Sequence, residues 1–218
     1  MPSNSPGRSS RRTVPRRVYS IGVTGAIGSG KSTVCRLLMK EGFPVLSADE
    51  IARELQERDA KLRRKVARLL GQRAYASNGR MNRAFVASRI FGSAGLRKKL
   101  ERIVHPAVRR ELKKRMKKLF ASGRRVVIVE AALIFESGLD QILDLIVVVE
   151  ARRDLRLARL RKRDRNDATV RGRMAAQWSP REKAAHADIL IRNNDGLSTL
   201  RRNVALLTSV LSAFARRS

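Results

Sequence analysis

The longest apolar runs of the chain are rich in valine and isoleucine and lie at residues 125–130 and 145–150. Strands that are buried on both faces of a parallel sheet have this composition, whereas half-exposed strands alternate apolar and polar positions. Shorter β-prone segments occur at residues 18–24, 43–47 and 188–191. The pattern therefore predicts a parallel sheet with the two valine-rich strands near its centre.

The segments between these strands repeat their apolar residues with the period of a helix. A helix is predicted at residues 31–40, residues 152–187 return to helix with many arginines, and an amphipathic helix closes the chain at 197–214. Strands that alternate with helices are typical of the α/β class, in which helices flank a parallel sheet. We therefore predict an α/β fold.

The segment from residue 50 to 121 is long for a simple crossover between two strands. It is mostly helical by period, and we expect interruptions at Gly71, at the turn formed by residues 77–79, and at Pro106. In such folds ligands sit outside the carboxyl ends of the parallel strands, where an inserted segment can grip a second substrate. We expect an all-helical, acceptor-binding insertion here.

Residues 1–17 combine serine, proline, glycine and arginine without hydrophobic periodicity. We interpret them as a basic, disordered tail outside the core. Their acid-free composition also overlaps with transit peptides, although Pro2, Pro6 and Pro15 argue against an amphipathic targeting helix. The remaining residues, 18–218, are enough for one compact domain and too few for two ordinary ones.

The composition is typical of a folded protein, with 43% hydrophobic and 31% charged residues. Its apolar runs are far shorter than the ~18 residues that cross a bilayer, so we expect no membrane span. The single cysteine, Cys35, cannot form an intrachain disulfide, which fits a reducing compartment. We expect Cys35 to be a small buried helix residue and the protein to be cytoplasmic.

Lysine and arginine total 49 against 19 aspartate and glutamate residues, which gives a formal charge of +30. A field of this sign attracts polyanions, and both an anionic small-molecule substrate and a nucleic acid fit it. Aromatic residues make up only 4%, and no aromatic–basic stacking motif is present, which argues against the nucleic acid. The net charge alone does not distinguish an anionic substrate from a nucleic acid. We expect any nucleic-acid contact to be electrostatic.

Residues 25–32 read Gly-Ala-Ile-Gly-Ser-Gly-Lys-Ser and fit the P-loop pattern G-x-x-x-x-G-K-[ST] between a predicted strand and a predicted helix. The glycines let backbone N–H groups curl around phosphate oxygens, and the helix N-terminus adds partial positive charge. We predict that Lys31 reaches the β- and γ-phosphates of ATP and that the Ser32 hydroxyl ligates Mg²⁺. The other loop residues expected to hold the nucleotide are Gly28, Ser29, Gly30 and Thr33.

Asp49 follows the second predicted strand and opens a helix. One interpretation is a helix N-cap. The other is a carboxylate that faces the phosphates and accepts the proton of an attacking hydroxyl, or holds Mg²⁺ through water. Glu130, at the end of the third strand, is likewise either an acidic residue near the metal or a simple strand-terminal polar residue.

Arginines are dense on the predicted helix after the fourth strand, at Arg156, Arg159, Arg161 and Arg163. Arginines beside a loop can close over a triphosphate and stabilise charge during transfer, which is the role of a lid. A solvated basic face is the alternative for most of them individually. We predict a lid at about residues 160–180, with Arg163 as its catalytic arginine.

These motifs together resemble the dephospho-CoA kinase family over residues 21–207. The family motif T-G-G-I-G-S-G-K-S-T is matched by residues 24–33, which differ from it only at Ala26. Further motifs of the family are matched by Ser47 to Ala52 (D-A-D-x-I-A), His105-Pro106 (H-P), Glu130 to Glu136 (acidic-x-P-L-L-x-E), Arg159 to Asp164 (R-x-x-x-R-D), Arg173, Gln177 and Lys183 (single R, Q and K positions), and Ala187 to Asn193 (A-D-x-x-I-x-N).

The resemblance implies a three-part kinase with a nucleotide core, a helical CoA-binding insertion and a lid. It implies that ATP phosphorylates the ribose 3′-hydroxyl of dephospho-CoA, the last step of coenzyme A synthesis. Asp49 would be catalytic, His105 would bind the acceptor, and the segment that ends at Asn193 would close over the adenine. Ser47 and Ala132 replace an aspartate and a proline of the family motifs, which leaves the metal contacts and acceptor affinity open.

Two other functions fit parts of the sequence. One is a P-loop kinase for a different nucleotide or small alcohol, because the P-loop itself does not define the acceptor. The other is an ATP-regulated nucleic-acid-binding protein, which the charge of +30 and the basic tail suggest. The sequence leaves the assembly open between a monomer and a small homo-oligomer.

Overall fold

The computed structural model describes residues 17–163 and 177–216. Five parallel strands form one sheet in the order β2-β3-β1-β4-β5. Their bounds are Tyr19–Thr24 (β1), Val45–Ser47 (β2), Val126–Glu130 (β3), Leu145–Glu150 (β4) and Ile189–Arg192 (β5). The predicted strands and the α/β class are therefore confirmed. Because β1 lies between β3 and β4, the P-loop after β1 starts at the middle of the sheet.

The central strands bury side chains on both faces, as their valine-rich sequences predict. In β3, Val126 and Ile128 join the hydrophobic cluster on one face, whereas Val127 and Val129 join the cluster on the other. Each helix layer can therefore exclude water from its own side of the sheet.

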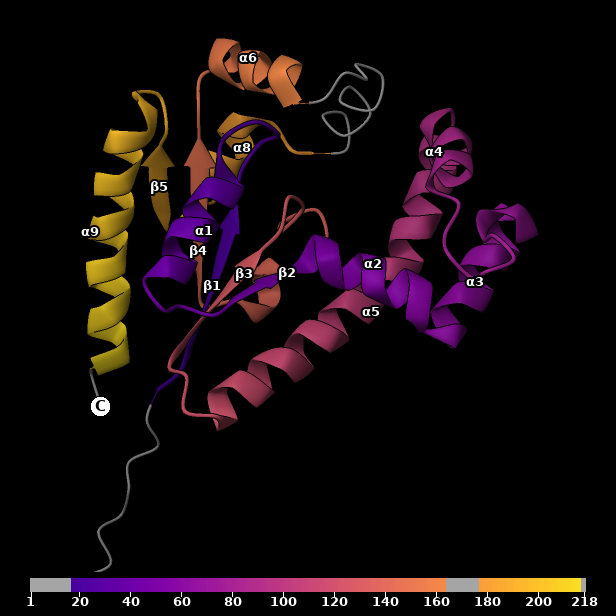
Figure 1. Ribbon diagram of the computed structural model, residues 1–218, viewed down its shortest axis with the longest axis horizontal. Coiled ribbons are helices and arrows are strands. Elements are labelled where there is room, and N and C mark those ends of the chain that lie inside the picture. Colours follow the sequence, from indigo (N-terminus) through magenta and orange to yellow (C-terminus); the bar gives the residue numbers. More distant parts are fainter. Residues whose placement is uncertain (1–16, 164–176, 217–218) are drawn as a thin grey trace, which may run out of the picture.

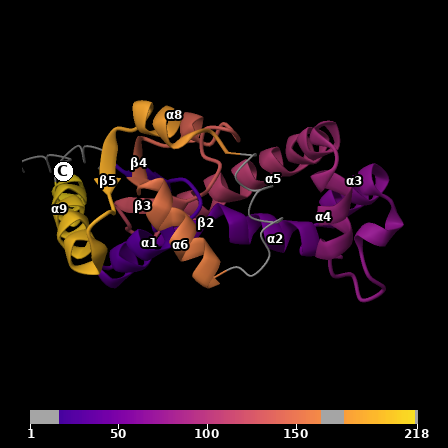
Figure 2. The ribbon, with the colours of Figure 1, turned by 90° about the horizontal axis from the view of Figure 1, so that it is seen from above.

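Helices α1 (Lys31–Lys40) and α9 (Gly196–Arg216) cover one face. Leu38 of α1 and Leu200 and Leu211 of α9 are fully buried there, and Tyr19 stacks on Phe214 near the C-terminus. Cys35 of α1 is buried in the same cluster, as expected, and burial raises the pKa of its thiol to about 12. Helices α6 (Arg153–Arg163) and α8 (Pro180–Ala185) lie near the carboxyl ends of the strands (Figures 1 and 2).

The segment between β2 and β3 is helical and extends to one side of the sheet (Figure 1). It contains α2 (Ala48–Arg58), α3 (Ala60–Leu70), the short helix η1 (Gln72–Ala74), α4 (Arg83–Phe91) and α5 (Ala94–Ala121). Ser47, Asp59, Asn82 and Ser93 cap the four α-helices by accepting backbone N–H groups. The segment packs on the cluster that contains Val127 and Val129, so it shares a core with the sheet.

The predicted interruptions at Gly71 and at residues 77–79 are confirmed, but the one at Pro106 is wrong. Helix α5 continues through Pro106 to Ala121. Pro106 has no backbone N–H, so the carbonyl of Arg102 lacks its helical hydrogen bond. Because Arg102 is exposed, water can donate to that oxygen instead. Val104, Ala107 and Val108 are buried on both sides of the proline and hold the helix against the core. Among the described residues, no helix has the length and apolar character needed to span a membrane.

Candidate active site

The P-loop connects the end of β1 to the start of α1 through glycines that no other residue can replace without strain. Gly28 and Gly30 have φ values of 81° and 99°, in the left-handed region. A Cβ atom at Gly30 would clash with the side-chain amide of Asn193, and one at Gly25 would clash with the Val149 carbonyl. The loop is thus packed closely against the ends of β4 and β5.

Lys31 and Ser32 converge on the carboxylate that ends β3. The Lys31 ammonium lies 2.5 Å from Glu130 Oε1, and the Ser32 hydroxyl donates to the same oxygen at 2.8 Å. Both charged side chains are largely buried, with 14% and 15% of their surface exposed. A simple strand-terminal polar residue would not need these contacts, so the interpretation of Glu130 as an acidic residue of the phosphate site is favoured.

The environment of Glu130 keeps its carboxylate ionised. Burial acts to raise the pKa of Glu130, but the charge of Lys31 and the hydrogen bonds from Lys31 and Ser32 bring that pKa below the ordinary 4.5. The negative charge therefore persists at neutral pH at the position where the P-loop lysine and serine meet.

This lowered pKa predicts how stability depends on pH. A folded-state pKa below the unfolded value contributes stability above pH 4.5, and this contribution is lost as the pH falls through the folded value. We expect the Glu130→Gln variant to lose less stability than the native protein between neutral pH and pH values well below 4.5. Urea unfolding at a series of pH values measures this difference, and parallel pH profiles for the two proteins would contradict it.

Asp49 lies in the first turn of α2, and it is not the N-cap. Ser47 is the N-cap, because its hydroxyl accepts the backbone N–H of Glu50 at 3.3 Å. The interpretation of Asp49 as an N-cap is therefore wrong. Ser47 pairs with Glu130 in the β2–β3 register, so Asp49 follows the strand end that neighbours the P-loop carboxylate. Asp49 is exposed, and no hydrogen bond or ion pair to another described residue occupies its carboxylate.

The backbone carbonyls of the P-loop accept hydrogen bonds from the side chains of Arg156, Arg159 and Asn193. Asn193 is buried and donates to the Ser29 carbonyl at 2.8 Å. Arg159 donates to the carbonyls of Gly28, Ser29 and Asn193 at 3.3, 3.4 and 3.0 Å. Arg156, only 7% exposed, donates to the Ile27 carbonyl at 3.4 Å. With its carbonyls engaged on this side, the loop can direct its N–H groups toward a phosphate.

For Arg156 and Arg159 the alternative of a solvated basic face is therefore wrong. Arg161 is exposed and fits it. The side chain of Arg163 and residues 164–176, which include Arg173 and most of the predicted lid, lie outside the described residues. Contact of Asn193 with adenine stays a prediction, since its described contacts are with the P-loop.

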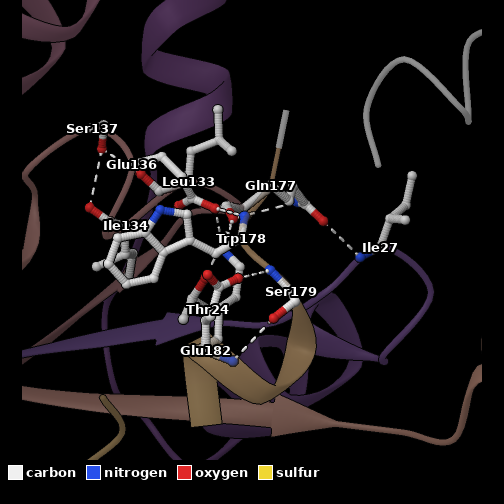
Figure 3. A network of polar contacts seen from close by, with 12 residues as sticks. Thr24, Ile27, Leu133, Ile134, Glu136, Ser137, Gln177, Trp178, Ser179 and Glu182 are labelled. Carbon is white, nitrogen blue, oxygen red and sulfur yellow. Dashed lines mark hydrogen bonds and ion pairs between the residues drawn. The ribbon is translucent and has the colours of Figure 1, made fainter. Parts of the chain in front are cut away.

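The described end of the predicted lid, from Gln177 on, is tied to both the P-loop and the loop after β3 (Figure 3). The backbone N–H of Ile27 donates to Gln177 Oε1 at 3.0 Å, and Gln177 Nε2 donates to the Ala132 carbonyl at 3.4 Å. The Trp178 backbone N–H donates to Glu136 Oε1 at 2.6 Å. Residues 177–178 therefore connect the P-loop to the loop after β3 by hydrogen bonds.

Lys183, in the last turn of the short helix α8, belongs to the same network. It is fully buried, and its ammonium lies 2.8 Å from both the Ala132 carbonyl and Glu136 Oε1. Burial lowers the pKa of Lys183, while its hydrogen bond to Glu136 and the charge of that carboxylate act to raise it. Sequence reasoning from the residues alone gave Gln177 and Lys183 no role; only the family motif marked their positions.

His105 is half-buried on α5. Burial lowers the pKa of His105 below 6.5, although the charges of Glu101 and Glu136 act to raise it. The ring is therefore neutral at neutral pH and can both donate and accept a hydrogen bond. One turn along α5, Arg109 donates to Gln141 Oε1 at 3.4 Å, while its Nε is buried without a partner among the described residues. Sequence reasoning missed Arg109.

No group of three or more His, Cys, Asp or Glu side chains in the described part of the chain is arranged to hold a metal ion. Mg²⁺ in kinases is commonly bound by one or two protein oxygens together with substrate phosphates and water. Ser32 and Glu130, with Asp49 in the helix turn that follows the neighbouring strand, form a donor set of that limited kind. The residues present are thus compatible with a cation that arrives with its phosphates.

A family model for dephospho-CoA kinase matches residues 19–199, a span that holds the P-loop, the helical segment and the network around Glu136. The chain belongs to the dephospho-CoA kinase family. It is therefore a kinase that uses ATP, and the reaction of the family is the last step of coenzyme A synthesis.

Relatives and solved structures agree with this family. A dephospho-CoA kinase of Geobacillus kaustophilus is 37% identical over 186 residues, covering 85% of this chain and 92% of the relative. The structure of a dephospho-CoA kinase from Campylobacter jejuni has a TM-score of 0.68 and 26% identity, covering 89% of this chain and 97% of the other. A shikimate kinase from Acinetobacter baumannii, with a TM-score of 0.52, 16% identity and coverage of 91% and 96%, shares the fold, which confirms the predicted P-loop kinase class.

The two residues that depart from the dephospho-CoA kinase motifs, Ala132 and Ser47, make contacts that the family's own residues could also make. Ala132 takes part through its backbone carbonyl, which accepts hydrogen bonds from Lys183, Gln177 and, at 3.5 Å, Thr24. A proline would present the same carbonyl. Ser47 caps α2 with its side-chain oxygen, a role in which aspartate serves equally well.

Proposed function

We propose that this protein transfers the γ-phosphoryl group of ATP to the ribose 3′-hydroxyl of dephospho-CoA, with Mg²⁺ as the metal. The observation that carries the proposal is the convergence of Lys31 and Ser32 on Glu130 beside the strand end that leads to Asp49. This brings a cation, a hydroxyl ligand and two carboxylates to one edge of the sheet. Phosphoryl transfer needs positioning and charge neutralisation above all, and this set supplies both.

Lys31 neutralises charge on the transferred group. Its ammonium pairs with Glu130 at 2.5 Å, which positions it at the mouth of the P-loop. A bound triphosphate would attract the ammonium with more negative charge than one carboxylate carries. Ser32 would hold Mg²⁺, which supplies further neutralisation of the phosphates, and Glu130 would face the same ion.

Asp49 is the base in this proposal. Its carboxylate is exposed, it is not needed to cap α2, and it lies in the first turn of α2, two residues after the strand end that pairs with Glu130. A carboxylate that accepts the proton of the ribose hydroxyl as the new phosphate ester bond forms leaves the hydroxyl oxygen as the nucleophile. ADP then leaves with the electron pair of the broken phosphoanhydride bond.

The helical segment of residues 48–121 is the proposed acceptor-binding part, with His105 as its contact. The partly unpaired guanidinium of Arg109 faces the connection after β3, and the neutral imidazole of His105 lies one turn before it on α5, which suits a polar and anionic acceptor. The roles of Arg163 in the lid and of Asn193 beside the adenine are proposed on the family motif. A cytoplasmic location is proposed with them.

A comparison of acceptors tests the assignment. Purified protein with ATP and Mg²⁺ is given dephospho-CoA, nucleoside monophosphates or shikimate, and kcat/KM is measured for each. We expect turnover with dephospho-CoA alone, and its loss when Mg²⁺ is chelated. Turnover of nucleoside monophosphates without turnover of dephospho-CoA would overturn the acceptor, and activity that persists with chelator would overturn the metal.

A further inference from the structure

A basic groove of about 310 Å³ lies between α3 and α5, in the helical segment. Its floor is apolar and includes Leu62, Ile103 and Ala107. Its walls carry five cations, namely Lys61, Arg64, Lys65, Arg68 and Arg110. The single acidic side chain of the lining, Asp59, already accepts the backbone N–H groups of Lys61 and Leu62 as the N-cap of α3. The groove therefore presents almost pure positive charge.

The groove faces away from the candidate active site. Ile103 and Ala107 lie two residues before and after His105, and at about 100° per residue each is about 160° around the helix axis from it. Arg109, one turn after His105, reaches Gln141 in the connection after β3. The groove residues Ile103, Ala107 and Arg110 lie about 100° to 160° around the axis of α5 from Arg109, so they line other sides of the helix. Both views show α3 at the end of the molecule remote from α9 (Figures 1 and 2). The kinase chemistry therefore does not explain the groove.

The charges in the groove are not neutralised within the protein. All five cations are exposed, and none forms an ion pair with another described side chain. Helix α3 has five lysines and arginines and no acidic residue, and α5 has eleven against two glutamates. By contrast, Arg115 on another side of α5 pairs with Glu54 and Glu111. Uncompensated charge of one sign opposes folding, and a polyanion would relieve it.

We propose that this groove binds the phosphodiester backbone of nucleic acid, without reading its sequence. From Lys61 to Arg68 the cations extend over seven residues of α3, or about 10 Å. At ~3.4 Å of duplex axis for each phosphate of one strand, that length corresponds to about three phosphates, whereas a metabolite with one phosphate would use only part of it. The lining contains no aromatic residue on which a base could stack, so the contacts are with phosphates.

The surface around the groove favours nucleic acid over a membrane. Membrane-surface helices place large apolar side chains beside their basic residues. The exposed large hydrophobic residues of the described chain, such as Phe91, Leu190 and Leu206, lie outside both α3 and α5. The groove is also concave, so its cations converge on a strand better than on a flat bilayer. This inference does not depend on the proposed acceptor.

Two triple variants with equal net charge test the groove. The groove variant is Lys61→Gln, Lys65→Gln and Arg68→Gln; the control is Lys40→Gln, Arg201→Gln and Arg202→Gln, exposed positions on α1 and α9. Binding of a fluorescein-labelled short RNA duplex, the matching DNA duplex and a single strand is measured against salt concentration. At about 0.15 M salt we expect the groove variant to bind at least ~10-fold more weakly, with a salt slope shallower by about 2 to 3. The control should bind within about twofold of the native protein.

Three outcomes would overturn the proposal. Equal weakening in both variants would mean that the total charge, and not the groove, binds the RNA. A raised KM for dephospho-CoA in the groove variant alone would make the groove part of the acceptor site. Groove-dependent binding of anionic phosphatidylserine vesicles that exceeds RNA binding would make a membrane the partner. Unchanged kcat and KM in both variants support the proposal and confirm that both fold.

Discussion

Replacing Lys31 with alanine is expected to lower the rate of phosphoryl transfer on the order of 10³-fold, because the transferred group loses its positioned cation. The ammonium of Lys31, the first residue of α1, lies 2.5 Å from Glu130. The measurement is kcat with saturating ATP and acceptor. Lys40→Ala, at the exposed end of the same helix, is the control and should retain activity within about twofold.

The Lys31→Ala variant also loses stability, because Glu130 remains largely buried without its partner. The double variant Lys31→Ala/Glu130→Gln removes that unpaired charge, so we expect its stability to recover while its activity stays lost. Thermal unfolding followed by circular dichroism separates these two effects. A kcat within tenfold of the native value in either variant would contradict the role of Lys31.

Replacing Asp49 with asparagine is expected to lower kcat by at least ~100-fold, the scale of a positioned general base. Stability should not change, because Ser47 and not Asp49 caps α2. The matched control is Glu50→Gln, which removes the same charge at the next residue of the same helix turn. We expect that control to keep its activity within about twofold.

Ser47→Ala completes this set. Loss of the N-cap is expected to cost about 1 kcal/mol of stability, measured by urea unfolding. If Asp49→Asn instead destabilised the protein by that amount with a near-normal kcat, Asp49 would be a structural residue. If Ser47→Ala left stability unchanged, the assignment of the N-cap would be wrong.

The sheet could be predicted from sequence because its interior strands are buried on both faces. The runs at residues 126–130 and 145–150 are apolar at every position between their ends. A half-exposed strand would need apolar residues only at every second position. The P-loop was also predictable, since its glycines are fixed by local backbone geometry. Pro106 was misjudged because burial of Val104, Ala107 and Val108 outweighs the local cost of a proline, and a local rule does not include that burial.

The contacts of the site depend on strand order, which local patterns do not contain. Lys31 and Glu130 meet because β1 lies directly beside β3, and Arg159 reaches Gly28 because β4 lies on the other side of β1. Gln177 joins the backbone of Ile27, 150 residues earlier in the chain. For the same reason a density of arginines did not distinguish those that brace the P-loop from the exposed Arg161.

The groove between α3 and α5 could not be predicted from the sequence for a different reason. The charge of +30 follows from the composition, but the composition does not say where on the surface the charges gather. The helix packing gathers five cations around an apolar floor and turns them away from His105. The structure thereby gives the attraction for polyanions a specific location, and charge-matched variants can test that location.

The most direct test of the kinase proposal is the identification of its product. The protein is incubated with ATP, Mg²⁺ and increasing dephospho-CoA, and the product is followed by ³¹P NMR and mass spectrometry. We expect saturable formation of coenzyme A with a new phosphomonoester on the ribose 3′-oxygen, one ADP for each coenzyme A, and no product with Lys31→Ala. ATP hydrolysis that leaves dephospho-CoA unchanged at every concentration would contradict the proposal.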